Sequence, residues 1–71
     1  MRKLIRRDWE GHTEYDLDTQ EAIQELERAM NAGMLAVAAK GEQAVQVTDA
    51  REAAVREAEE VRLFWPLAGG R

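Results

Sequence analysis

The residues best placed to take part in covalent chemistry are two adjacent glycines near the C-terminus. Gly69 and Gly70 follow an apolar segment and are followed by Arg71. Because glycine has no Cβ, another protein's backbone can approach it closely, and such a segment can enter a narrow active-site channel. A carboxylate on Gly70 is a group that an ATP-using enzyme can adenylate. The spacing indicates a tail on which enzymes act, and the alternative is an ordinary frayed terminus.

The rest of the chain offers little catalytic chemistry. It has no cysteine, which excludes disulfides, thiolate zinc sites and a cysteine nucleophile. The single histidine, His12, lies between Glu10 and Glu14, and we interpret it as a solvent-facing strand residue rather than a metal ligand. The sequence has no phosphate-binding loop and no nucleophile–base pair. We therefore expect a protein that is not an enzyme and holds no metal and no cofactor of its own.

Length and composition predict one small soluble domain. The chain has 71 residues, of which 45% are hydrophobic and 34% are charged. A chain of this size buries only about 60% of its unfolded surface, which leaves little room for a deep substrate pocket. The net charge of −4 disfavours nucleic-acid binding, and no apolar run is long enough to span a membrane. We expect a cytoplasmic protein without a signal peptide, monomeric when free.

Residues 2–17 predict a β-hairpin. Residues 2–9 mix charged and apolar side chains, and Glu10-Gly11 is a turn signal. From His12 onward the polarity alternates, which would place Tyr15 and Leu17 on the inner face of a half-buried strand.

Residues 19–32 predict the main helix. Asp18 is expected to be its N-cap, and Glu21, three residues later, completes a capping-box-like pair. Apolar residues then recur at helical spacing, and Gly33 is expected to end the helix.

The second half of the chain predicts three further strands and a short helix. The apolar run 34–39 is typical of a strand buried on both faces, and 43–48 alternates with Val45 and Val47 inward. Asp49 is expected to cap a short helical stretch, with Glu52 at the matching position.

Residues 61–67 predict the last strand. Val61, Leu63 and Trp65 share one face of it, Arg62 and Phe64 share the other, and Pro66 ends regular pairing because it has no N–H to donate. Since Phe64 and Trp65 are adjacent, they cannot both point into one core, and one ring is expected to be exposed.

Taken together, these elements predict an α+β domain, with a sheet covered on one face by the main helix. We place the domain at residues 1–67 and a flexible tail at residues 68–71.

The element order and the segment Trp65-Pro66-Leu67-Ala68-Gly69-Gly70 resemble the ubiquitin-like β-grasp family. The tail is similar to the Pro-x-Ala-Gly-Gly ending of the small subunit of molybdopterin synthase and to tails of bacterial ubiquitin-like proteins encoded beside activating and conjugating enzymes. The sulfur carriers of this family end on Gly-Gly, whereas Arg71 follows here, and this difference favours a protein modifier that is trimmed before use.

The resemblance implies a ubiquitin-like β-grasp fold, a mixed sheet of four to five strands packed on one main helix. The first and last strands would be adjacent and parallel at its centre. The residues expected to meet between the sheet and the helix are Leu4, Ile5, Val61 and Leu63 with Ile23, Leu26 and Met30.

The resemblance also implies a sequence of partners. A processing peptidase would cleave after Gly70, an activating enzyme would adenylate the new carboxylate with its own ATP, and a conjugating enzyme would pass it to target proteins. Lys3 and Lys40 are the possible acceptors if chains form. The alternatives are a sulfur carrier with a thiocarboxylate on Gly70, and a small non-covalent binding or structural module with an inert tail.

Partner enzymes are expected to dock on the sheet face that the helix leaves uncovered and along the tail. The residues that we expect to bind partners are Arg62, Phe64, Trp65, Leu67 and Ala68.

Overall fold

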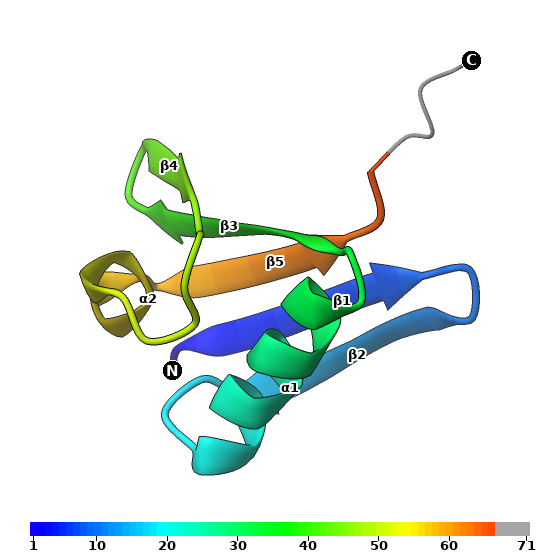
Figure 1. The fold of residues 1–71 in the computed structure, drawn as a ribbon. Coiled ribbons are helices and arrows are strands. Elements are labelled where there is room, and N and C mark those ends of the chain that lie inside the picture. The colour runs from blue at the N-terminus through cyan, green and yellow to red at the C-terminus, as the bar shows by residue number, and fades with distance from the viewer. Residues whose placement is uncertain (67–71) are drawn as a thin grey trace.

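A computed structural model describes residues 1–66 of the chain (Figure 1). Its elements, in chain order, are β1 (Lys3–Asp8), β2 (Gly11–Asp16), α1 (Gln20–Asn31), β3 (Leu35–Lys40), β4 (Gln43–Gln46), α2 (Ala53–Glu57) and β5 (Glu60–Phe64).

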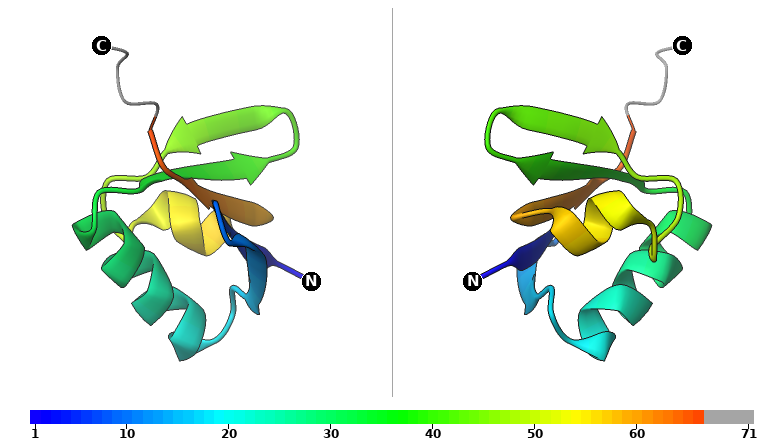
Figure 2. Two further views of the ribbon diagram at one scale, coloured as in Figure 1. Left: turned by 90° about the vertical axis from the view of Figure 1, so that its right-hand side faces the viewer. Right: turned by 90° about the vertical axis from the view of Figure 1, so that its left-hand side faces the viewer.

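The five strands form one mixed sheet in the order β2-β1-β5-β3-β4. The two central strands, β1 and β5, are parallel, whereas β1–β2, β3–β5 and β3–β4 are antiparallel. The long helix α1 packs across one face of the sheet (Figures 1 and 2). The chain therefore has a β-grasp-like α+β fold, as predicted, with the first and last strands side by side at the centre.

The hairpin between β1 and β2 turns one residue earlier than predicted. Trp9 and Glu10 form the turn, because the Asp8 carboxylate accepts a hydrogen bond from the backbone N–H of Glu10 at 2.8 Å. Gly11 follows with a φ of 122°, which suits a residue without a Cβ. The turn therefore lies at Trp9-Glu10 and not at the predicted Glu10-Gly11, because the Asp8 side chain bonds to the backbone of Glu10.

The N-cap of α1 is Thr19, and the prediction of Asp18 was wrong. The Thr19 hydroxyl accepts the N–H of Ala22 at 3.2 Å, whereas the Asp18 carboxylate pairs with the Arg2 guanidinium at 2.6 Å. At the other end the prediction was right, since Gly33 has a φ of 106°. The N–H groups of Gly33 and of the next residue bond back into the last turn in a Schellman motif.

The core lies between the sheet and the two helices. Its largest fully buried side chains are Leu4, Leu17, Leu26, Val55, Val61 and Leu63. The placement of Ile5 in this core was wrong: successive strand residues point to opposite faces, so the burial of Leu4 turns Ile5 to the other side. Its register partner on β5 is accordingly the exposed Arg62.

Strand β3 was expected to be buried on both faces, but only one face is buried. Ala36 and Ala38 are buried beneath the helices, whereas Leu35, Val37 and Ala39 on the opposite face are only half-buried. The reason is that both helices lie on the same side of the sheet, so that no helix of residues 1–66 covers the other side (Figure 2).

The segment after β3 departs from prediction in two places. Val47 is buried as expected, but Val45 is 53% exposed, because no helix or strand of residues 1–66 covers it. The short helix α2 has Glu52 as its N-cap, and Asp49 does not cap it. Glu52 instead reaches back and accepts the N–H groups of Thr48 and Asp49, each at 2.7 Å.

Candidate functional site

Strand β5 lies at the centre of the sheet, and Trp65 and Pro66 follow it. Because β5 is parallel to β1, it ends at the same edge of the molecule as the β1–β2 turn (Figure 1). Pairing stops at Phe64, two residues before Pro66, as the missing proline donor predicted. The remaining predicted tail residues, Leu67, Ala68, Gly69, Gly70 and Arg71, lie outside the described part of the chain.

Two tryptophan rings lie together at the end of β5. Trp65 stacks on Trp9 of the β1–β2 turn, with 5.8 Å between ring centroids and 22° between the planes. Trp65 is half-buried and also lies against the end of α1, where a Cβ on Gly33 would be 3.8 Å from its Cζ3 atom. Trp9 is 81% exposed. Trp65, the first residue after β5, thus lies between the hairpin turn and the helix terminus.

The indole N–H of Trp65 is a buried donor without a hydrogen-bond partner among residues 1–66. Phe64, the neighbouring residue, points to the opposite face and is 38% exposed. The expectation that one of these two adjacent rings is exposed is therefore confirmed. The two aromatic side chains lie on different faces of the sheet: Trp65 is on the helix side, and Phe64 is on the opposite side.

The uncovered sheet face carries an apolar strip bordered by arginines. The strand register places Ile5 beside Arg62, and Phe64 beside Leu35. A hollow of about 320 Å³ on this side is lined by Ile5, Arg7, Arg62, Leu63 and Phe64. Arg62 pairs with Glu60. We call the residues Ile5, Arg7, Leu35, Val37, Arg62 and Phe64 the free face.

Of the partner-binding residues predicted from sequence, Arg62 and Phe64 share the free face, and Trp65 lies on the other side of the sheet. Sequence reasoning missed Ile5 and Arg7 as members of this surface. The signal that could have identified them is the alternation within β1, since Ile5 and Arg7 are two residues apart and must share a face.

The polar groups beside the free face form an exposed cluster on β1 and β2. Lys3 Nζ lies 3.3 Å from one oxygen of Glu14, and His12 Nε2 lies 3.2 Å from the other. The hydrogen bond from His12, followed by the bond and charge of Lys3, lowers the pKa of the Glu14 carboxyl below its ordinary value. Lys40, the other predicted acceptor, is exposed at the end of β3.

Two further kinds of feature are absent from residues 1–66. Among residues 1–66, acidic and histidine side chains form no cluster of three that could hold a metal ion. Within the same range, neither helix is long and apolar enough to cross a membrane.

Comparisons of this chain with protein-family models, curated proteins and solved structures found no match. Its functional interpretation therefore rests on the tail sequence, the fold and the surfaces around the end of β5.

Proposed function

We propose that this chain is a ubiquitin-like protein modifier, which partner enzymes join to target proteins through Gly70. The observation that carries the proposal is the position of β5. This central strand is parallel to β1 and is followed, without another helix or strand up to Pro66, by the sequence Leu67-Ala68-Gly69-Gly70. In the sequence, a central strand is thus followed within a few residues by the glycines that an enzyme channel can admit.

The chemistry is carried out by partners, and the chain supplies the acyl group. A peptidase removes Arg71 and exposes the Gly70 carboxylate. An oxygen of this carboxylate attacks the α-phosphorus of ATP bound to the activating enzyme, which forms an acyl-adenylate and releases pyrophosphate. A cysteine thiolate of the enzyme displaces AMP and forms a thioester. An amine of the target then attacks this thioester, an amide bond forms, and the thiol is released.

The free face supports this proposal as the docking surface for the activating and conjugating enzymes. Phe64 and Ile5 provide apolar contact area near the start of the tail, while Arg62 and Arg7 add positive charge. Aromatic and arginine residues are enriched among the side chains that dominate binding energy at interfaces. The surface fits a partner that presents apolar side chains together with carboxylates.

The stacked tryptophans support the proposal in a second way. An enzyme that receives the tail must find its first residues in a defined direction, since catalysis depends on positioning. Trp65 is anchored against Trp9 and Gly33 directly before Pro66, which restricts the direction in which the chain leaves the sheet.

The test is the intact mass of the full-length protein purified from its native host with its partner enzymes present. We expect species that have lost Arg71 and larger species that contain one copy joined to another protein. Gly70→Ala should abolish the larger species, whereas Gln24→Ala, a substitution at an exposed position of α1, should leave them unchanged. A mass increase equal to sulfur replacing oxygen would identify a sulfur carrier instead. Retention of Arg71 with no adducts would contradict both and favour a non-covalent binding module.

A further inference from the structure

Strand β4 forms an unprotected edge of the sheet. It is the last strand in the sheet order, and all four of its residues, Gln43–Gln46, are exposed. Edge strands are commonly protected by charged side chains, proline or bulges. The opposite edge strand, β2, carries His12, Glu14 and Asp16, whereas β4 reads Gln-Ala-Val-Gln and has no charge.

The backbone of β4 has hydrogen-bonding groups that point away from β3. The N–H of Val47 donates to the carbonyl oxygen of Ala36 at 2.8 Å. In an antiparallel pair, residues that bond to the neighbour alternate with residues that do not. The backbone groups of Ala44 and Gln46 therefore face the open edge, and within residues 1–66 no loop or side chain bonds to them.

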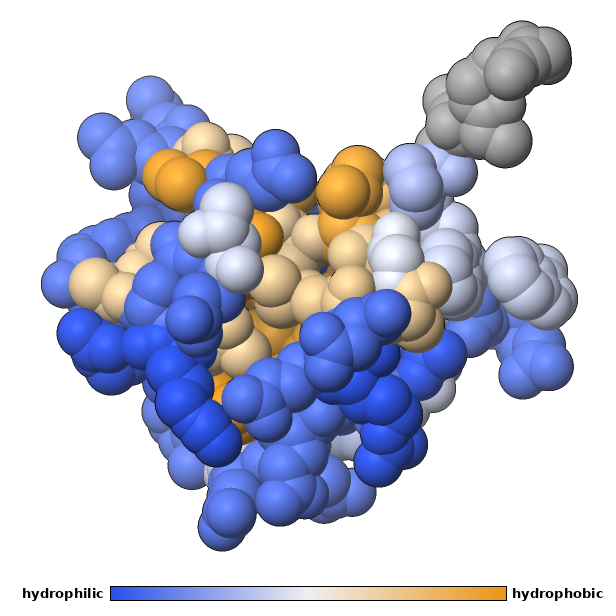
Figure 3. Space-filling view, in the orientation of Figure 1, coloured by the Kyte–Doolittle hydropathy of each residue, from blue (hydrophilic) through white to orange (hydrophobic). Residues whose placement is uncertain are grey.

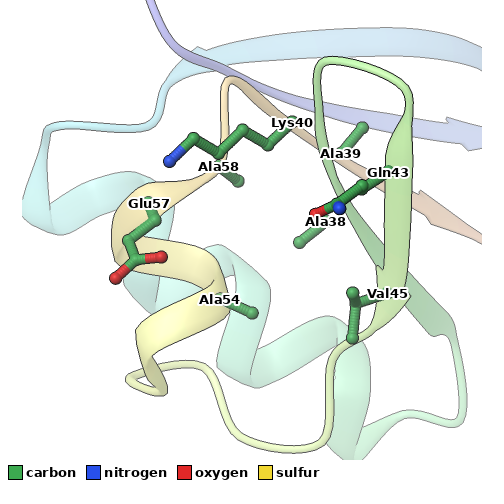
Figure 4. Close-up of a pocket in the computed structure, with 8 residues that line it drawn as sticks. All are labelled: Ala38, Ala39, Lys40, Gln43, Val45, Ala54, Glu57 and Ala58. Carbon is green, nitrogen blue, oxygen red and sulfur yellow. The ribbon is translucent and has the colours of Figure 1, made fainter.

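A hollow with mixed apolar and polar lining lies beside this edge, between the β3–β4 hairpin and α2 (Figure 4). Its volume is about 120 Å³, and half of the residues that line it are alanines: Ala38, Ala39, Ala54 and Ala58. The others are Val45 and three polar residues, Lys40, Gln43 and Glu57. Val45 stands at its mouth, and Figure 3 shows apolar surface in the region between the hairpin and the helices.

The edge and the hollow are related by strand geometry. Val45 and Ala38 are register partners and point to the helix side of the sheet. A strand added beyond β4 would place the side chain opposite Val45 on this same side. That side chain would enter the space between β4 and α2. An engineered cavity of about 150 Å³ holds benzene, so a hollow of about 120 Å³ suits one branched aliphatic side chain.

We propose that the β4 edge binds an extended segment of a partner protein, which pairs with Ala44 and Gln46 and inserts one valine-, isoleucine- or leucine-sized side chain into the hollow beside β4. In this mode of recognition the backbone bonds supply affinity and the pocket supplies side-chain selectivity. The site lies on the far side of β3 from β5 and does not involve the tail, so it is independent of the proposed modifier function.

The probe is a capped synthetic peptide of about eight residues in which threonine alternates with valine and a central valine is replaced by leucine. It is titrated into the ¹⁵N-labelled full-length protein and followed by NMR. We expect saturable shifts at β4, Ala54 and Ala58, and slower amide hydrogen exchange at Ala44 and Gln46. A peptide with alanine at the central position should bind about tenfold more weakly.

Two substitutions at adjacent positions of α2 test whether binding depends on the hollow itself or on the surrounding surface. Ala54→Leu fills the hollow and should weaken peptide binding by about tenfold, while Ala53→Leu, on an exposed position that does not line it, should leave binding unchanged. Ala44→Pro should also weaken binding, because it removes an outward-facing donor without affecting pairing to β3. Gly70→Ala should have no effect on this binding.

Several results would overturn the proposal. The proposal fails if neither peptide binds saturably, if the leucine and alanine peptides bind with equal affinity, or if the NMR shifts are confined to the free face. A concentration-dependent dimer in the absence of peptide, with shifts at β4, would assign the edge to a second copy of the chain. The peptide comparison uses the unaltered protein, so it decides the question even if Ala54→Leu does not fold.

Discussion

Replacing Trp9 with alanine tests the aromatic pair at the end of β5. The Trp9 ring is 81% exposed, so the substitution removes little burial from water. What it removes is the stack on Trp65, whose centroid lies 5.8 Å away. Aromatic pairs contribute about 0.5–1.5 kcal/mol beyond the area that they bury. We therefore expect Trp9→Ala to lower the free energy of unfolding by about 1 kcal/mol, which lowers Tm by about 4–8 °C in a domain of this size.

The assay is urea unfolding followed by far-UV circular dichroism, with thermal unfolding as a second measurement. Trp9→Tyr keeps an aromatic face and should retain most of the lost stability. Glu10→Ala changes the neighbouring turn residue without removing a ring and should leave stability nearly unchanged. Trp9→Ala also leaves Trp65 as the sole tryptophan, so its half-buried ring can be followed by fluorescence without interference.

Two results would refute this reasoning. If Trp9→Tyr and Trp9→Ala were equally destabilising, ring stacking would not be the cause. If Trp9→Ala had no effect on unfolding, the pair would contribute nothing to stability in solution, and Trp9 would not hold Trp65 in place.

Three further predictions follow from contacts at β5, between β1 and α1, and in the segment before α2. Phe64→Ala should change the free energy of unfolding by less than about 1 kcal/mol, because the ring is partly exposed, yet should sharply reduce the amount of conjugate. Arg6→Leu should lower the free energy of unfolding in urea by about 2 kcal/mol, because among residues 1–66 it leaves the Glu25 carboxylate, 7% exposed, paired with Arg28 alone, at 3.4 Å. The double variant Arg6→Leu/Glu25→Leu should recover most of this loss. Hydrogen bonds from the backbone N–H groups of Thr48, the larger effect, and Asp49 hold the pKa of Glu52 below its ordinary value of 4.5. The Glu52 carboxylate therefore contributes stability above pH 4.5, and this contribution is lost as the pH falls through the lowered pKa.

Each of these predictions has a result that contradicts it. Unchanged conjugation in Phe64→Ala would remove the free face from the docking surface. A double Arg6/Glu25 variant no more stable than Arg6→Leu alone would show that the lost stability does not come from an uncompensated carboxylate. For Glu52, the comparison is Glu52→Gln: if its acid unfolding profile were the same as that of the unaltered protein, the carboxylate would not contribute.

Local patterns in the sequence were sufficient to predict most of the elements. Strand alternation identified β2 and β5, and helical spacing with Gly33 identified α1 and its end. These signals work because side-chain period and backbone conformation are set within a few residues. The separation of Phe64 from Trp65 was predictable for the same reason, since adjacent strand residues face opposite sides.

Details that depend on distant partners were not predictable in this way. Asp18 and Thr19 are both good caps, and the choice was made by Arg2, which binds Asp18 from the start of the chain. Leu4 and Ile5 are both apolar, and only the register with β5 decided which one entered the core. The exposure of Val45 depends on where α2 lies. The alternation of residues 43–48 carries no information about that position.

The sequence by itself determined the Gly69-Gly70 pair, the lack of cysteine and the period of each element, because these are properties of residue type and near neighbours. The tertiary structure decided which residues became surfaces. The placement of both helices on one side of the sheet created the free face, and the pairing of β1 with β5 brought Trp9 to Trp65. The same arrangement left the four residues of β4 exposed beside a hollow that has four alanines in its lining. These features depend on contacts between residues far apart in the chain, and such contacts form only when the whole domain folds.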